Sequence, residues 1–232
     1  MDFRPDELNK ELVVQIPYAT IKRLPIYQRY LNELAAKGVE RISSREFAVK
    51  LGASPSQLRQ DLSYFGSFGQ QGYGYRVEDL LQQINRILGL DMGEKMVLIG
   101  AGHLGTALAN YNNFMRRGLV ITAIFDKNPN VIGKHVGGIL VRDIIELPEY
   151  LNAAPIEIGI IATPSEVAQE VTDQLVKGGV KGIWNFASVG LLKAPDDVIV
   201  ENVHISESLF LLSFKLQQRK QSQTGNEGKE IK

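Results

Sequence analysis

The chain has 232 residues, 44% of them apolar and 22% charged, with a formal net charge of zero. This length allows two modest globular domains. The absence of cysteine excludes disulfides and thiol chemistry, and the three histidines are too far apart for a metal-ligand motif. No apolar run is long enough for a membrane span, and the acidic start is unlike a signal peptide. We therefore expect a cytoplasmic protein with no metal site and no membrane partner.

The charge is unevenly distributed. Between Ile16 and Arg76 there are three Lys and six Arg against three Glu and one Asp, so nine minus four gives +5, and the remainder carries −5. A basic segment joined to an acidic one indicates a nucleic-acid-binding module fused to another domain.

Helical signals dominate residues 1–88, for which we predict one domain. A helix over Tyr18–Lys37 should be kinked or restarted at Pro25. A short helix, Arg45–Leu51, has two candidate capping serines before it and Gly52 after it.

A further helix then opens with Ser54 as the N-cap and Pro55 at its first position. The turn-rich sequence GSFGQQGYGY follows, and then an amphipathic helix over Val77–Leu88. This order fits a winged helix-turn-helix, or equally a generic three-helix domain.

The second half alternates short apolar runs with helical segments, which predicts a Rossmann-type parallel sheet over 95–205 after the linker LDMGEK. The expected strands are MVLIG, VITAIF, GILV, IGIIAT, GIWNF and VIVENV, and the expected helices lie near 104–117, 143–152 and 165–177. Ser206 can cap a last helix, 206–219, and 220–232 reads as a disordered tail.

The sequence VLIGAGHLGTALANY places Gly100, Gly102 and Gly105 in GxGxxG spacing between a strand and a helix, as in dinucleotide-binding folds. Asp126 ends the next strand, 21 residues beyond Gly105. A carboxylate there can accept hydrogen bonds from ribose hydroxyls and would repel a 2′-phosphate. This favours NAD(H) over NADP(H).

Two further segments follow predicted strands and are candidates for the nicotinamide side, Thr163–Ser165 and Asn185–Ser188, whereas Trp184 is better explained as a core residue. His204 has no recognisable catalytic partner. Together with the N-terminal domain, this favours NADH as a ligand and not a substrate, so we predict no enzymatic activity.

The segments IPYATIKRLPIYQRYL, SSREFA and QLRQDLSYFGSFGQQGYGY resemble the N-terminal domain of Rex redox-sensing repressors. GAGHLGTALANY, FDKNPNVIG, ATPSEVAQEV, GVKGIWNFA and VIVENV continue that resemblance in the same order, over roughly 16–216. The resemblance implies a homodimer with a winged helix, a Rossmann core and a C-terminal helix exchanged between subunits. It also implies a repressor that binds a palindromic double-stranded operator and releases it when NADH binds, with NAD as the weaker or opposing ligand.

The resemblance assigns residues to three roles. Those near the cofactor are Gly100, Ala101, Gly102, His103, Leu104, Gly105, Asp126, Lys127, Thr163, Pro164, Asn185, Phe186 and Ala187. Those near DNA are Lys22, Arg23, Arg45, Ser54, Ser56, Gln57, Arg59, Gln60, Tyr64, Gln70, Gln71 and Gly72, with Ser54–Phe65 as the recognition helix and 70–72 as the wing tip. Those that couple the cofactor pocket to the DNA-binding heads are Arg29, Tyr111 and His204.

The chain departs from the family pattern at several of these positions. Gln60, Gln70 and Gln71 stand where the family usually has basic residues, which weakens phosphate attraction. Ser188 replaces a proline, and His204 replaces an acid that would pair with Arg29. Three alternatives stay open: an NAD-dependent oxidoreductase with an accessory domain, a Rex-like protein that has lost its NADH response, and a CoA- or nucleotide-binding regulator.

Overall fold

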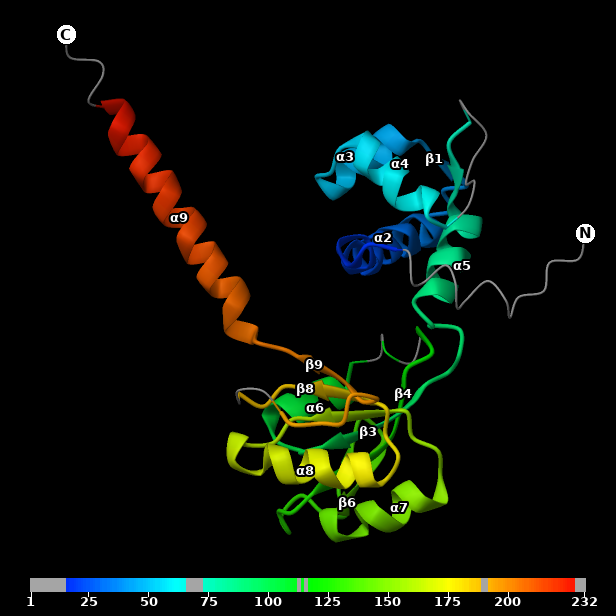
Figure 1. The fold of residues 1–232 in the computed structure, drawn as a ribbon, viewed down its shortest axis with the longest axis vertical. Helices are drawn as coiled ribbons and strands as arrows, with labels where there is room; N and C mark the ends of the chain where they lie inside the picture. The colour runs from blue at the N-terminus through cyan, green and yellow to red at the C-terminus, as the bar shows by residue number, and fades with distance from the viewer. Residues whose placement is uncertain (1–15, 66–72, 112–113, 115–116, 189–191, 228–232) are drawn as a thin grey trace, which may run out of the picture. The chain divides into compact units, whose positions relative to one another are not determined.

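The computed structural model describes residues 16–65, 73–111, 114, 117–188 and 192–227 (Figure 1). The chain divides into two compact units, Met1–Gly93 and Glu94–Lys232. This division falls inside the LDMGEK segment. In the described part of the chain, no helix is both long and apolar enough to cross a membrane.

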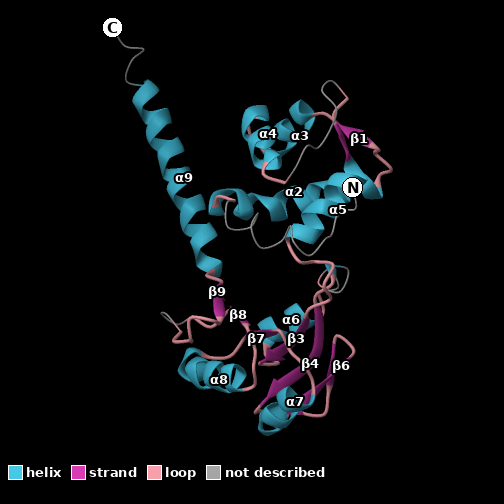
Figure 2. Cartoon of the chain, turned by 45° about the vertical axis from the view of Figure 1, so that its right-hand side comes forward, coloured by secondary structure: helices cyan, strands magenta, loops and turns pink. Residues whose placement is uncertain are grey.

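The first unit is a small helical domain with a two-stranded sheet. Its elements are α2 (Tyr18–Ala36), β1 (Arg41–Ile42), α3 (Ser44–Leu51), α4 (Pro55–Ser63), β2 (Tyr75–Arg76) and α5 (Val77–Ile87). Strands β1 and β2 pair antiparallel, with Ile42 opposite Tyr75. Figure 2 shows α3 and α4 as a pair, and α2 packs against α5. This is the arrangement of a winged helix-turn-helix.

Local signals explain the helix-turn-helix. Ser43 caps α3 in a reciprocal capping box with Glu46, and Gly52 ends that helix in the left-handed conformation with φ 65°. Ser54 caps α4 by accepting a hydrogen bond from the amide of Gln57, with Pro55 as the first helical residue. The capped starts predicted from sequence are therefore confirmed.

Of the kink or restart expected at Pro25, the restart is wrong, because α2 runs through this residue without a break. The kink stays a prediction. Pro25 is exposed, so the backbone carbonyl that loses its hydrogen bond can face water. The buried side chains of Leu24, Tyr27 and Leu31 hold the helix on both sides of the proline. Tertiary packing here outweighs the local cost of proline.

The second unit is a seven-stranded sheet in the order β5-β6-β4-β3-β7-β8-β9, parallel except for β5. Its strands are β3 (Lys95–Ile99), β4 (Val120–Asp126), β5 (His135–Val136), β6 (Ile139–Asp143), β7 (Ile158–Ile161), β8 (Gly182–Asn185) and β9 (Ile199–Asn202). The chain reverses direction across the sheet between β3 and β7, which is the switch point where such sheets bind ligands.

Helices cover both faces of this sheet (Figure 1). They are α6 (His103–Ala109), the 3-10 turn η2 (Ile144–Glu146), α7 (Leu147–Ala153) and α8 (Ser165–Lys177). One core includes Val97, Phe125 and Leu175 beneath α7 and α8. The other includes Leu98 and Ile160 and adjoins Leu108 of α6. The Rossmann-type prediction is confirmed.

One additional strand and two helix boundaries differ from the sequence prediction. Strand β5 was not expected. Helix α6 ends at Ala109 and not near 117, because poor helix formers follow it and the ring of Phe114 packs against Trp184. Helix α9 spans Ile205–Glu227, so Ser206 lies inside its first turn and the helix continues beyond 219 into the segment predicted as tail.

Candidate functional site

The three glycines after β3 have different spatial reasons to be glycine. Gly100 has φ 105°, and a Cβ there would lie 2.5 Å from the carbonyl oxygen of Ala162. A Cβ at Gly105 would collide with the carbonyl oxygen of Gly100. Around Gly102, by contrast, a Cβ would meet no atom of the described residues within 4 Å. Gly100 and Gly105 are therefore needed by the fold, whereas Gly102 leaves space for something that approaches from outside.

Asp126 ties the end of β4 to this loop. One carboxylate oxygen accepts a hydrogen bond from the amide of Ala101 at 2.6 Å, and the other accepts one from the amide of Asn128 at 2.8 Å. An ionised carboxylate has about four acceptor positions, so two remain for a ligand. Asp126 can accept hydroxyl hydrogen bonds while it holds the glycine loop in place.

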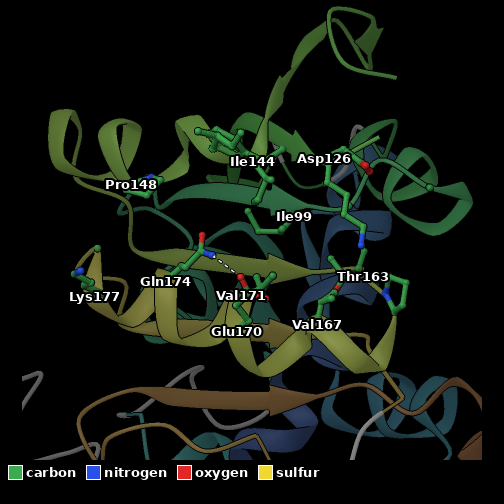
Figure 3. A pocket seen from close by; sticks show the side chains of 18 of the residues that line it. Ile99, Asp126, Ile144, Pro148, Thr163, Val167, Glu170, Val171, Gln174 and Lys177 are labelled. Atoms are coloured by element: carbon green, nitrogen blue, oxygen red, sulfur yellow. Dashed lines mark hydrogen bonds between the residues drawn. The ribbon is translucent and has the colours of Figure 1, made fainter. Parts of the chain in front are cut away.

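A cavity of about 730 Å³ opens beside this loop at the carboxyl ends of β3, β4 and β7. It continues between η2–α7 on one side and α8 on the other. Figure 3 shows Asp126 and Thr163 toward one end, and Pro148, Gln174 and Lys177 toward the other. The lining residues include Ile99, Gly100, Gly102, Phe125, Asp126, Lys127, Ile144, Ile145, Pro148, Thr163, Pro164, Val167, Glu170, Val171, Gln174 and Lys177.

The cavity combines apolar walls with a few polar groups. Ile144 and Val167 contribute apolar surface suited to a flat ring, and Lys127 and Asp126 bring opposite charges to one end. The hydroxyl oxygen of Thr163 is buried there without a hydrogen-bond partner among the residues that the structure describes. Because a buried hydroxyl without a partner is costly, this atom is suited to a polar ligand group. The donor set fits a dinucleotide.

Six of the residues expected near the cofactor line this cavity: Gly100, Gly102, Asp126, Lys127, Thr163 and Pro164. Ala101, His103, Leu104 and Gly105 belong to the loop and first turn of α6, where the backbone amides have no acceptor within a helix. Asn185 ends the neighbouring strand β8, and Phe186 and Ala187 follow it; none of the three is among the lining residues.

Asn185 forms hydrogen bonds that hold the end of β8. It is buried, its amide nitrogen donates to Asn202 Oδ1 at 2.8 Å, and its amide oxygen accepts from the amide of Ala187 at 3.0 Å. Phe186 packs edge-on against Trp184, with ring centroids 4.5 Å apart. Both residues shape the turn after β8, and Trp184 packs against the core as predicted.

The second candidate site is the exposed face of α4. Ser56, Arg59 and Gln60 are all exposed and lie on one side of the helix, and Ser63 continues the same side. The N-terminal residues of a recognition helix reach base edges in the major groove. The sequence prediction named the first three and missed Ser63, which the i, i+4 spacing from Arg59 could have revealed.

Beneath this face lies a buried acid that the sequence prediction also missed. The side chain of Asp61 has no exposed surface. It accepts hydrogen bonds from Thr20 Oγ1 at 3.0 Å, Arg23 Nε and Nη2 at 2.6 Å each, Tyr27 OH at 2.6 Å and Gln57 Nε2 at 3.1 Å.

Burial alone would raise the pKa of Asp61, but these hydrogen bonds outweigh the effect of burial, and the pKa is lowered. The signal was available, since Asp61 falls on the apolar side of α4 between Leu58 and Leu62.

Two of the residues expected near DNA, Arg23 and Gln57, donate hydrogen bonds to Asp61. The guanidinium of Arg23 is engaged with Asp61, which raises the Arg23 pKa, so it is not a free surface cation. Gln57 is half-buried and donates to the same carboxylate. Burial and the hydrogen bond to Asp61 also raise the pKa of Tyr27.

The other residues expected near DNA differ in how exposed their side chains are. Lys22 and Arg45 are exposed, with the Lys22 ammonium 4.8 Å from the Tyr18 ring centroid. Tyr64 is half-buried and Ser54 is the exposed cap of α4. Gln70, Gln71 and Gly72 lie outside the described residues.

The three expected coupling residues are divided between the units. Arg29 lies on α2 of the first unit, and Tyr111 and His204 belong to the second. All three side chains are exposed, and the Tyr111 ring packs edge-on against Phe114.

Comparisons with known proteins agree with both halves of this description. Residues 15–63 match the family described as "Putative DNA-binding protein N-terminus", and residues 91–189 match "CoA binding domain". The redox-sensing transcriptional repressor Rex of Clostridium botulinum (strain Alaska E43 / Type E3) is 54% identical over 205 residues, which cover 88% of this chain and 97% of the relative. Rex of Thermoanaerobacter sp. (strain X514) is 48% identical over 209 residues, covering 90% and 92%.

Solved structures of a Rex-family repressor, RSP, are also similar. The structure titled as its complex with β-NADH has a TM-score of 0.82 and 43% identity, covering 90% of this chain and 98% of that one. The structure titled as its complex with β-NAD+ and operator DNA has a TM-score of 0.82 and 45% identity, covering 93% and 99%. With identity near 50% along most of its length, the chain belongs to the Rex family of redox-sensing transcriptional repressors.

Proposed function

We propose that this protein binds a palindromic operator through α4 and releases it when NADH occupies the cavity beside Gly102. The observation that carries the proposal is the presence, in one chain, of a helix-turn-helix with an exposed polar face and a cavity beside a dinucleotide-type loop. A relative that matches over 97% of its own length is named a redox-sensing transcriptional repressor.

In this proposal the pyrophosphate lies against Gly102 and the first turn of α6. Asp126 accepts the ribose hydroxyls with its remaining lone pairs, and the Thr163 hydroxyl gains a partner. The adenine ring fits between Ile144 and Val167. The nicotinamide lies toward the turn after β8, where Phe186 and Ala187 provide apolar surroundings.

The apolar turn after β8 also supports discrimination between the two redox forms. Reduced nicotinamide is neutral and oxidised nicotinamide is a cation, so apolar surroundings favour NADH. To release DNA, NADH must bind the DNA-incompetent state more tightly, since equal affinity for both states shifts nothing. We propose that the cofactor is a ligand and that the protein catalyses no reaction.

A homodimer completes the proposal. Seven large apolar side chains of α9 are each more than half exposed: Ile205, Leu209, Phe210, Leu211, Leu212, Phe214 and Leu216. Such a surface marks an interface in a protein of this class. A second copy accounts for it and supplies the two-fold symmetry that a palindromic operator requires.

The test is fluorescence anisotropy with a panel of labelled palindromic duplexes, with and without NADH. Specific binding that is lost with NADH and retained with NAD is the expected result. Specific binding that is unchanged by NADH contradicts the proposed response to NADH and directs attention to His204. The absence of specific binding contradicts the repressor half and directs attention to Gln60.

A further inference from the structure

Gln57 lies on the first turn of α4, at the edge of the exposed face that carries Ser56 and Gln60. Its amide nitrogen is 3.1 Å from Oδ1 of Asp61, one helical turn further along. Gln57 therefore belongs to two environments, the recognition face and the buried cluster beneath it.

The chemistry of this contact fixes which way the amide points. The nitrogen and oxygen of a glutamine amide have nearly the same shape, so the surroundings decide the orientation. An ionised carboxylate can only accept hydrogen bonds, and the lowered pKa of Asp61 keeps it ionised. Turning the Gln57 amide over would place its oxygen against a carboxylate oxygen, which is repulsive. The nitrogen must face Asp61, which leaves Oε1 and one N–H for another partner.

Asp61 cannot turn to follow Gln57, because other groups hold it. Arg23 donates to both of its oxygens, and Tyr27 and Thr20 donate one hydrogen bond each, all from α2. These contacts fix the carboxylate against the body of the domain. The orientation of the Gln57 amide is therefore fixed before DNA binds, which lowers the entropy cost of a contact between this amide and a base.

We propose that Asp61 is a positioning residue for base recognition, which holds the Gln57 amide so that its free N–H and Oε1 read adenine in the major groove. Adenine presents an acceptor at N7 beside a donor at N6, and a glutamine amide in fixed order matches this pair. The inference rests on the proposed operator binding. It assigns to a buried acid a role in sequence preference as well as in stability.

The experiment measures binding of the full-length protein to the operator and to variants with one base pair changed at a time. Wild type is compared with Gln57→Ala, Asp61→Asn and the double variant. Gln57→Ala and Asp61→Asn should each reduce the preference for adenine at the same position by about tenfold. The double variant should reduce it no further than either single change, which is the signature of two residues acting together.

Tyr27→Phe is the matched control. It removes another hydrogen bond to the same carboxylate without touching Gln57. It should lower the thermal unfolding midpoint while leaving the relative preference for each base pair unchanged. A purely structural role for Asp61 would make Asp61→Asn behave like Tyr27→Phe, with all duplexes weakened equally.

Outcomes for the two proposals are distinguishable. A wild-type protein without specific binding contradicts the proposed function. Specific wild-type binding with a uniform loss in Asp61→Asn, or an unchanged profile in Gln57→Ala, overturns only the positioning role. If Asp61→Asn does not fold, side-chain NMR of the labelled wild type decides. One Gln57 Nε2 proton should exchange slowly with solvent, and fast exchange of both would overturn the proposal.

Discussion

The polar cluster around Asp61 and the polar groups of the cavity differ in what completes them. Asp61 receives five hydrogen bonds from side chains of the same chain. In the cavity, within the described part of the chain, the Thr163 hydroxyl has no hydrogen-bond partner and Gly102 faces open space. Helix α4 is thus held in place by the protein itself, whereas the cavity has groups suited to a ligand. The Asp61 cluster is suited to rigidity, and the cavity is suited to respond to a bound ligand.

Removing the charge at the centre of the rigid region should have the largest effect on stability. Asp61→Asn leaves Arg23 without its anion and puts an amide among donors. We expect the first unit to lose about 3 kcal/mol, near the lower end for breaking a buried pair because Arg23 is partly exposed. Urea unfolding followed by circular dichroism measures this change. A loss below about 1 kcal/mol would show that the cluster is not a main support of the unit.

Acid should remove the same contribution gradually. The pKa of Asp61 is lowered in the folded protein, so its stabilising effect is complete above its ordinary unfolded value near pH 4. The effect is lost as pH falls through the lowered folded pKa. The protection of the α4 amides against hydrogen exchange, relative to their intrinsic rates at each pH, should therefore fall below about pH 4 in wild type. In Asp61→Asn this acid-dependent step should be absent, and its persistence would assign it to another group.

Two glycine changes compare space needed by the fold with space left for a ligand. Gly105→Ala forces a Cβ against Gly100, so α6 must shift, at a cost of about 1–3 kcal/mol. NADH affinity should fall about a hundredfold and the unfolding midpoint should drop. Gly102→Ala meets no protein atom, so it should lower NADH affinity while the midpoint stays near that of wild type. Calorimetric titration and thermal melts measure both.

The result for Gly102→Ala is the sharper test of this pair. If the variant binds NADH as wild type does, the pyrophosphate does not pass beside Gly102 and the proposed placement is wrong.

The smallest expected effect on NADH affinity comes from removing the Thr163 hydroxyl. Thr163→Val removes a buried group without a partner, so stability should stay equal or rise slightly. If NADH supplies the missing partner, its affinity should fall about fivefold, corresponding to about 1 kcal/mol. Equal NADH affinity in the two proteins would mean that Thr163 does not contact the cofactor.

Features set by neighbouring residues were predictable from the sequence. The cap at Ser54, the stop at Gly52 and the glycine loop depend on a few adjacent positions, and each lies where expected. The continuous α2 across Pro25 was not predictable from local rules, because packing of the residues around it decides the outcome. The early end of α6 depends likewise on Phe114 meeting Trp184 far along the chain.

In the candidate sites, too, features set by local sequence were predictable and features set by tertiary packing were not. The sequence placed Gly102, Asp126 and Thr163 together because the ends of parallel strands meet at one edge. It did not find the α7–α8 side of the cavity, which depends on how two helices pack. It assigned Arg23 to DNA without showing its ion pair, because a free arginine and one paired with an acid look alike in sequence. Only the position of Asp61 beneath α4 distinguishes them.

The exposed apolar side of α9 has a consequence for how the protein unfolds. A helix that buries Leu209, Phe210 and Leu212 only in an assembly contributes to stability only when a partner is present. Stability then follows mass action, and dilution alone lowers the unfolding midpoint. The number of copies in the cell would accordingly set the fraction of intact repressor, independently of any change in the redox balance.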